Sequence, residues 1–424
     1  MRCILVLSVL FAAQLCRAAE AQMAIHEWGT FTSFQNELGE AMGGINSDDE
    51  PVPGFVHSLG LDDDVKGAAR CFADVTMRLE TPVLYFHPAV TADGAVSRAE
   101  TRLDVQVEFR GGWLTEFYPN ALFEAPGLRT PAPKTGRHLT SATVGKLAWS
   151  GVEVGGDAAG PKTAARVWTA PREVDAANVT FALPGKKAES EKFLFYRGVG
   201  HIEAPIRVVR QSNFLEVHSQ LSSGILADAP LAIGAAWLAG FKSDGTCAFR
   251  KQEKMELTND TKQIIATIPS EFSNSAYAAG NLESLRKELL AGLIQDGLFA
   301  DEATALLNTW EVSYFKSSGM RLFFLVPRTW TEHYLPLKIS VPSSSVRTMV
   351  GRIELVTPEH RALLRKLSEI PDVKSYFGNN PLKPGPYKDL GRFRNSLLLD
   401  EQKRHPAGSL AAFIKLYGLE GMNP

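Results

Sequence analysis

An alternation of apolar and polar residues constrains the fold of this chain more than any other feature, because it predicts β-strands. From residue 103 to 109 every second side chain is apolar, as in a strand with one buried face. Gly111-Gly112 then predicts a tight two-residue turn into the next strand. That turn would set Val107 opposite Glu116. We therefore expect Glu116 to point into the protein, on the apolar face of a hairpin.

The rest of the chain predicts a β-rich α+β protein. Further strands are expected at 25–32, 75–86, 147–154, 179–183, 192–197, 206–211, 214–219, 231–241, 322–326, 335–341 and 346–356. Apolar residues at helical spacing predict a helical hairpin at 282–296 and 303–314, and shorter helices near 358–370, 390–404 and 409–416. The expected architecture is an antiparallel, sandwich-like N-terminal part at 22–270, with an α+β part at 271–424 packed on it.

Residues 1–21 have the three parts of a secretory signal peptide. Arg2 supplies the positive start, residues 3–13 form a short apolar run, and Ala19-Glu20-Ala21 offers a small-residue cleavage site. The mature chain would begin near Gln22 and would be secreted or periplasmic. No other apolar run approaches the length of a membrane span, so we expect none in the mature chain.

Two cysteines remain after the predicted cleavage. An even number of cysteines in an exported protein favours a disulfide, so we expect Cys71 and Cys247 to be linked. The alternative is two unrelated buried thiols, because a free cysteine behaves as a small apolar residue.

The composition excludes one class of partner. The formal net charge is −2 at pH 7, and the basic residues are scattered along the chain rather than clustered. Binding to nucleic acid depends on a concentrated positive surface. We therefore expect no nucleic-acid partner.

Six distinctive stretches are spread over most of the mature chain. They are 26–32 (HEWGTFT), 79–86 (LETPVLYF), 114–119 (LTEFYP), 193–198 (FLFYRG), 335–337 (LPL) and 350–354 (VGRIE). In these stretches the chain resembles an uncharacterised family of exported bacterial proteins of the planctomycete type. The resemblance implies export and one shared architecture, and it implies no particular reaction.

Two carboxylates are candidate catalytic residues. Glu116 and Glu80 both lie in strongly apolar strands, where a carboxylate must be hydrogen-bonded, paired with a cation or raised in pKa. Two such groups could form the acid/base pair of a glycosidase. The alternative is structural, with Glu116 paired to an arginine such as Arg197, or with a register slipped by one residue that sends Glu116 to solvent.

Other polar and aromatic residues near these strands are candidate ligand contacts. They are His26, Glu27, Trp28, Tyr118, Arg197 and His201. The chain has neither H-E-x-x-H nor Cys-x-x-Cys, so we predict no metal site and no cofactor. One weaker alternative is a metal site at His201 and Glu203, which His218 could join.

The sequence favours an exported binding or envelope-associated module, with a glycan or an envelope component as partner. The alternative is a secreted hydrolase that uses paired carboxylates in a β-rich cleft. The two differ in geometry, because an enzyme should gather its polar residues in one cleft. The informative residues are Glu27, Glu80, Glu116, Arg197 and His201.

Overall fold

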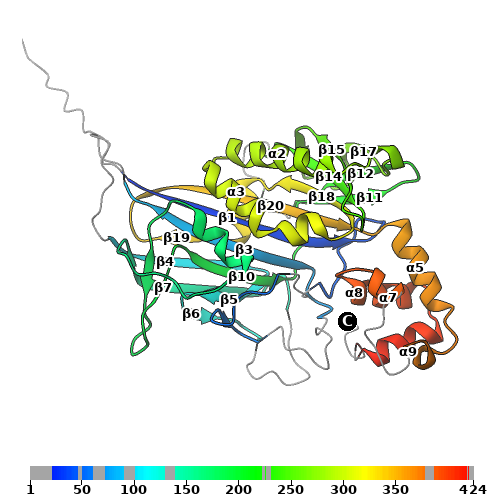
Figure 1. Cartoon of the computed structure of the whole chain (residues 1–424), viewed down its shortest axis with the longest axis horizontal. Helices are drawn as coiled ribbons and strands as arrows, with labels where there is room; N and C mark the ends of the chain where they lie inside the picture. Colours follow the sequence, from blue (N-terminus) through cyan, green and yellow to red (C-terminus); the bar gives the residue numbers. More distant parts are fainter. Residues whose placement is uncertain are drawn as a thin grey trace, which may run out of the picture.

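The computed structural model describes residues 22–45, 50–60, 72–89, 101–128, 139–221, 225, 231–377, 386–417 and 419. The predicted signal peptide at 1–21 lies outside these residues. One large sheet of fifteen strands runs through the described part of the chain, and helices cover part of one face and one end of it (Figure 1). The predicted class, β-rich α+β, is confirmed.

The strands follow one another closely along the chain. In order they are β1 (Met23–Gln35), β2 (His57–Ser58), β3 (Met77–His87), β4 (Thr101–Arg110), β5 (Gly112–Tyr118), β6 (Leu122–Glu124), β7 (Val144–Val154), β8 (Val179–Phe181), β9 (Glu189–Glu191), β10 (Leu194–Gly200), β11 (Ile206–Arg210), β12 (Phe214–Ser219), β13 (Leu231–Ile233), β14 (Ala236–Phe241), β15 (Cys247–Gln252), β16 (Met255–Leu257), β17 (Ile264–Pro269), β18 (Gly319–Leu325), β19 (Leu337–Ile339) and β20 (Ser343–Leu355).

The helices concentrate in the last third of the chain. They are α1 (Arg166–Thr169), η1 (Pro171–Glu173), η2 (Asn274–Ala276), α2 (Gly280–Gln295), α3 (Ala300–Thr309), η3 (Val312–Lys316), α4 (Arg328–Tyr334), α5 (Pro358–Ser368), α6 (Val373–Phe377), α7 (Pro386–Asp389), α8 (Arg394–Arg404) and α9 (Gly408–Leu416). The predicted helical hairpin is present as α2 and α3. Its second helix ends earlier than expected, because the chain changes to the π-helical turn η3 after Trp310.

The large sheet is mixed, with β1 at its centre. Its strand order is β15-β14-β18-β20-β1-β3-β10-β5-β7-β4-β19, and β1 pairs parallel with β20 and antiparallel with β3. Two small sheets, β11-β12-β17 and β13-β16, accompany it. The predicted boundary between residues 270 and 271 does not coincide with a break in the large sheet, since β18, β19 and β20 pair with strands from the earlier part.

The alternation of side chains in β1 separates two cores. Ile25 and Phe31 face the larger core, which β4 and β7 also line. Trp28 faces the second core, which lies under α2 and α3. Phe34, at the end of the strand, joins a third core formed with α5, α8 and α9. Figure 1 shows these C-terminal helices beside one end of the sheet.

The predicted hairpin at Gly111-Gly112 is wrong, and so is the prediction that Glu116 lies opposite Val107, which lines the larger core. β7 lies between β4 and β5, so Val107 pairs with Leu147 rather than with Glu116. The Gly111 N–H donates to the carbonyl of Thr143, which anchors the turn to β7 instead of closing a hairpin. Glu116 is nevertheless 5% exposed, as expected.

The Cys247 thiol is free and fully buried. Its predicted partner, Cys71, lies outside the described residues. Phe72, the next residue, packs against the third core, whereas Cys247 belongs to the second. The part of the chain that the structure describes therefore gives no support to the predicted disulfide, and burial raises the pKa of the Cys247 thiol.

None of the helices in the described ranges combines the length and the apolar character that a membrane span requires.

Candidate functional site

A row of buried charged side chains crosses the middle of the large sheet, on the face that carries the second core. We call it the charged row. Strand residues contribute four arginines and three glutamates, and Glu50 and Arg392 reach the row from outside the strands. Its members are Glu50, Arg78, Glu80, Glu116, Arg197, Arg321, Arg352, Glu354 and Arg392.

Strand register explains why these residues meet. Thr32 on β1 lies between Arg352 on β20 and Arg78 on β3. One step along the same face, Thr30 lies opposite Glu80. Cross-strand partners share a face of the sheet, so charges from separate strands form one continuous line. At its two ends, Arg321 pairs with Glu354 and Arg197 pairs with Glu116.

Glu80 is the electrostatic centre of the row. Its side chain is 1% exposed, and it forms ion pairs with Arg392 and with Arg78, whose Nε lies 3.5 Å from Oε1. The Thr32 hydroxyl donates to Oε2 at 3.1 Å. Burial alone would raise the pKa of Glu80, but Arg392, Arg352 and Arg78 outweigh burial and lower the pKa to about 2. Glu80 is therefore an anion at every physiological pH.

Glu50 has the opposite character in the same row. Burial, together with the smaller effect of the nearby negative charge of Glu80, raises the pKa of Glu50 to about 7. The N–H groups of Val312 and Ser313 donate to Oε1 at 2.9 and 3.2 Å, which opposes the rise. These donors belong to η3, and π-helical turns are frequent at functional sites. Glu50 can therefore gain or lose a proton near neutral pH.

Arg352 is the least satisfied member of the row. The residue is 0% exposed, and its Nε lies 3.2 Å from Glu354 Oε1. The guanidinium carbon lies 5.6 Å from the centre of the Tyr314 ring. Neither Nη1 nor Nη2 has a hydrogen-bond partner among the described residues. Buried guanidinium nitrogens rarely stay unsatisfied, so Arg352 is the member of the row whose hydrogen bonds the described residues leave incomplete.

The row reaches the surface at a pocket with a cavity volume of about 320 Å³. Arg321, Arg392 and Lys316 line this smaller pocket against a single carboxylate, Glu354. Each cation also has a carboxylate partner, Glu354 for Arg321, Glu80 for Arg392 and Glu311 for Lys316. Of these partners only Glu354 lines the smaller pocket, so its wall is rich in cations, which favours negatively charged ligands.

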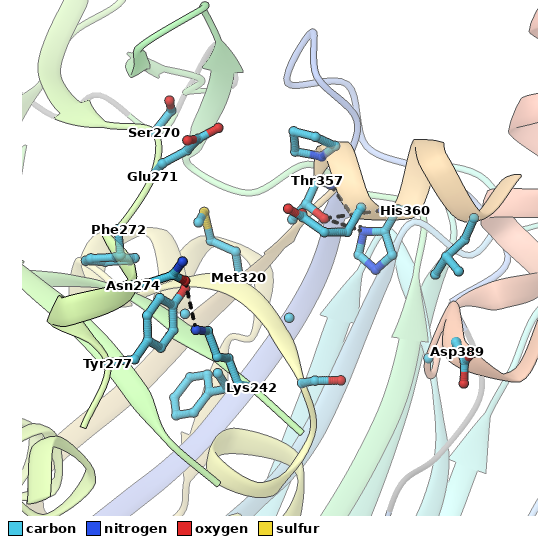
Figure 2. Close-up of a pocket in the computed structure, with 18 of the residues that line it drawn as sticks. Lys242, Ser270, Glu271, Phe272, Asn274, Tyr277, Met320, Thr357, His360 and Asp389 are labelled. Carbon is cyan, nitrogen blue, oxygen red and sulfur yellow. Dashed lines mark hydrogen bonds between the residues drawn. The ribbon is translucent and has the colours of Figure 1, made fainter. Parts of the chain in front are cut away.

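A larger pocket of about 580 Å³ adjoins the smaller one. The two share five lining residues: Ser318, Gly319, His360, Leu390 and Gly391. Figure 2 shows two opposed walls in the larger pocket. One wall carries Lys242, Glu271, Phe272, Asn274 and Tyr277, and the other carries Thr357 and His360 at the start of α5, with Asp389 beyond them.

His360 presents a defined donor to both pockets. It is the third residue of α5, and its Nδ1 accepts the N–H of Thr357 at 3.1 Å. Burial lowers the pKa of His360, so the ring is neutral at neutral pH. Because Nδ1 accepts a hydrogen bond, the single ring proton resides on Nε2. The ring can therefore donate from Nε2.

The structure brings three of the predicted residues together and separates the others. Glu80, Glu116 and Arg197 lie in the charged row, and Arg197 Nη1 is 3.4 Å from Glu116 Oε2. This is the ion pair that the structural alternative predicted. Glu27 lies on the opposite face of the sheet, where Arg347 Nε binds its Oε2 at 2.6 Å and the Tyr196 hydroxyl donates to Oε1.

The predicted aromatic and histidine contacts do not join the row. Trp28 and Tyr118 are 0% and 2% exposed and pack in the second core. His201 follows β10, and its Nδ1 lies 2.7 Å from the carbonyl of Asp74. His218 instead lies 3.4 Å from Glu216. The weaker alternative of a site at His201, Glu203 and His218 therefore gains no support from the described residues.

His26 belongs to a separate group that the sequence did not predict. Its Nδ1 lies 2.8 Å from Glu302 Oε2, and His87 Nε2 lies 3.0 Å from Glu302 Oε1. The potential donor atoms of these three residues lie within 4.8 Å of one another. We call this group the histidine–glutamate cluster.

Comparison with known proteins gives no assignment. No protein-family model matches the chain, and neither does any curated protein. Among solved structures, the yeast delta-COP-I mu-homology domain complexed with a Dsl1 WxWxV peptide is 8% identical, over 79% of this chain and 98% of that chain, with a TM-score of 0.26. The Danio rerio Fcho1 mu homology domain with bound Eps15 peptide is 10% identical, over 79% and 97%, with a TM-score of 0.27. Similarity this low establishes neither a shared fold nor a shared ligand.

Proposed function

We propose that the protein is an exported binding module for a hydroxylated ligand that carries a negative charge, such as an acidic sugar of the cell envelope. The ligand occupies the two adjoining pockets. Export rests on the signal-peptide pattern at residues 1–21. The negative charge of the ligand is inferred from the smaller pocket, which is lined by three cations and one carboxylate.

The charge of the smaller pocket is built into the fold. Arg321 is 1% exposed, and its Nη1 donates to the carbonyls of Ser313 and Tyr314 at 2.6 and 3.0 Å. Arg392 is ion-paired with Glu80 and packs over the ring of Phe393. These side chains hold fixed positions before any ligand arrives. A preorganised cationic wall loses little entropy on binding, which favours affinity for an anion.

The larger pocket supplies the contacts that a hydroxylated ligand needs. Asn274, Glu271 and His360 offer donors and acceptors, and Phe272 and Tyr277 are half-buried rings beside them. A mixture of aromatic rings and a few placed polar groups is typical of sites for small polar ligands. The ligand's negative group would then lie in the smaller pocket and its hydroxyl groups in the larger one.

The proposal predicts a dependence on ligand charge. Titration of the protein with tetragalacturonate should give saturable binding that weakens as salt is added, because the interaction is partly ionic. Cellotetraose, a neutral sugar of the same length, should bind at least about tenfold more weakly, a difference of about 1.4 kcal/mol. Equal affinity for both sugars would contradict the proposed role of the cations.

A second candidate function is hydrolysis, and one observation favours it. Glu50 and Glu80 interact, and their pKa values are about 7 and about 2. Two carboxylates whose surroundings separate their pKa values are the usual signature of an acid/base pair. The proton would reside on Glu50, so the acid is not Glu116 or Glu80, the two residues that the sequence suggested.

Glu50→Gln tests this candidate and the pKa of Glu50 together. Because the pKa of Glu50 is raised in the folded protein, Glu50 makes its full contribution to stability below about pH 4.5. This contribution is lost as the pH rises through 7. The Gln variant keeps an oxygen for the N–H groups of Val312 and Ser313. Its free energy of unfolding relative to wild type should therefore rise by about 1–3 kcal/mol between pH 5 and pH 8.

Urea denaturation at both pH values measures this difference. A constant difference between the variant and wild type would show that Glu50 is not raised in pKa. If the protein hydrolyses a glycoside, the folded Gln variant should also lose that activity. Retained turnover in Glu50→Gln would exclude Glu50 as the acid.

A further inference from the structure

The histidine–glutamate cluster forms because three elements meet at one corner of the sheet. His26 on β1 pairs with Tyr85, and His87 lies two residues further along β3, on the same face. Diagonal neighbours of this kind lie within reach of each other across a strand pair. Glu302 is the third residue of α3, and it reaches down to both rings from the start of that helix.

The carboxylate of Glu302 is buried and held in place. It is 0% exposed, and its Oε2 also accepts the N–H of Phe299 at 2.8 Å, which completes the cap of α3. The carboxylate is thus held between two imidazole rings and the start of α3.

Two imidazoles and a carboxylate are the ligand set of many zinc sites. Three protein ligands leave a fourth tetrahedral position for water or another ligand, whereas closed structural sites use four. Donor atoms around zinc lie about 2.0–2.2 Å from the metal. Since the donors here already lie within 4.8 Å of one another, small side-chain rotations suffice to surround an ion.

The surroundings leave the cluster accessible at one edge. The His87 side chain is 11% exposed and that of His26 is 5% exposed. Phe299 is the neighbouring surface residue, at 49% exposure, and its ring centre lies 4.5 Å from that of His26 and 4.9 Å from that of His87. An ion can therefore enter beside an exposed ring rather than through the core.

We propose that His26, His87 and Glu302 bind one divalent transition-metal ion, zinc by their donor types, with an open fourth position. His26 Nδ1, His87 Nε2 and Glu302 would be the ligands. The donor nitrogen of each ring must be unprotonated to coordinate, so a proton that it carries in the metal-free form passes to solvent or, through solvent, to the other ring nitrogen. The metal replaces the hydrogen bonds that His26 and His87 make with Glu302 in the metal-free form.

Cobalt titration of tag-free protein tests the site directly. Visible spectra should show the intense bands of four-coordinate cobalt and saturate at one ion per chain, and zinc should displace the cobalt. A band of thiolate-to-cobalt charge transfer should be absent, because no cysteine belongs to the cluster. Lack of saturable cobalt binding, or a strong thiolate band, would overturn the proposal.

Variants locate the ion. His87→Ala should weaken zinc binding by at least about 100-fold, and Glu302→Gln should weaken it too while keeping the size of the side chain. The matched control is His57→Ala, because His57 also pairs with a glutamate, Glu189, but lies outside the cluster. Circular dichroism of the metal-free variants checks their fold. Unchanged zinc affinity in both folded cluster variants would show that these residues form a structural hydrogen-bonded group only.

Discussion

Replacing Glu80 by Gln is expected to lower the free energy of unfolding at pH 7 by about 3–5 kcal/mol, because it leaves buried arginines without their counter-charge. Glu80 is 1% exposed and faces Arg78, Arg352 and Arg392. A buried cation that loses its partner pays the cost of desolvation with no compensating attraction. Urea denaturation of the variant and of wild type measures the loss.

The size of this loss should depend on pH in a defined direction. The lowered pKa of Glu80 means that its contribution is present above about pH 4.5 and is lost as the pH falls towards 2. The difference between Glu80→Gln and wild type should therefore shrink in acid. Glu124→Gln is the matched control, since its ion pair with Lys146 is largely exposed and should contribute less than about 1 kcal/mol. A loss that is equally small for both variants would refute the central role of Glu80.

Replacing Arg347 by Met is expected to lower the free energy of unfolding by a similar amount, about 3–5 kcal/mol. The role of Arg347 in this prediction is purely structural. Glu27 is 1% exposed, and Arg347 is its ion-pair partner on the face of the sheet opposite the charged row. Removal of the guanidinium leaves the Glu27 carboxylate buried, and among the described side chains only the Tyr196 hydroxyl still donates a hydrogen bond to it.

A double-mutant cycle separates the ion pair from simple packing. Glu27→Leu combined with Arg347→Met removes both charges, so the double variant should be more stable than either single variant. Ligand affinity at the pockets should stay at the wild-type value in every variant that folds, since Glu27 lies on the other face. Additive losses in the cycle would contradict a coupled buried pair.

The sequence predicted local features well and distant partners poorly. Alternation at residues 103–109 predicted which side chains of β4 share the buried face, because the side-chain period of a strand is two. Gly111-Gly112 could not reveal that β7 would lie between β4 and β5, because strand order depends on residues far along the chain. The burial of Glu116 could be predicted from its apolar neighbours, and its partner Arg197 was correctly named as an alternative.

The contacts that the sequence analysis missed share one cause. His26 binds Glu302 across 276 positions, and His87 binds it across 215. No local spacing motif records such a contact. Glu50 ends the acidic stretch Asp48-Asp49-Glu50, and nothing in this sequence showed that η3 would bury its side chain. Arg352 lay in a recognisable stretch, but only its unsatisfied nitrogens mark it as part of a site.

Calorimetric titration of matched lysine variants with tetragalacturonate is the most direct test of the proposed binding function. Lys316 lines the smaller pocket and Lys242 the larger, while Lys287 lies on α2 outside both and forms an exposed pair with Glu283. Lys316→Ala and Lys242→Ala should each weaken binding by about three- to tenfold, and Lys287→Ala should leave it unchanged. Equal affinity in all three variants and wild type, or no binding by wild type, would contradict the account.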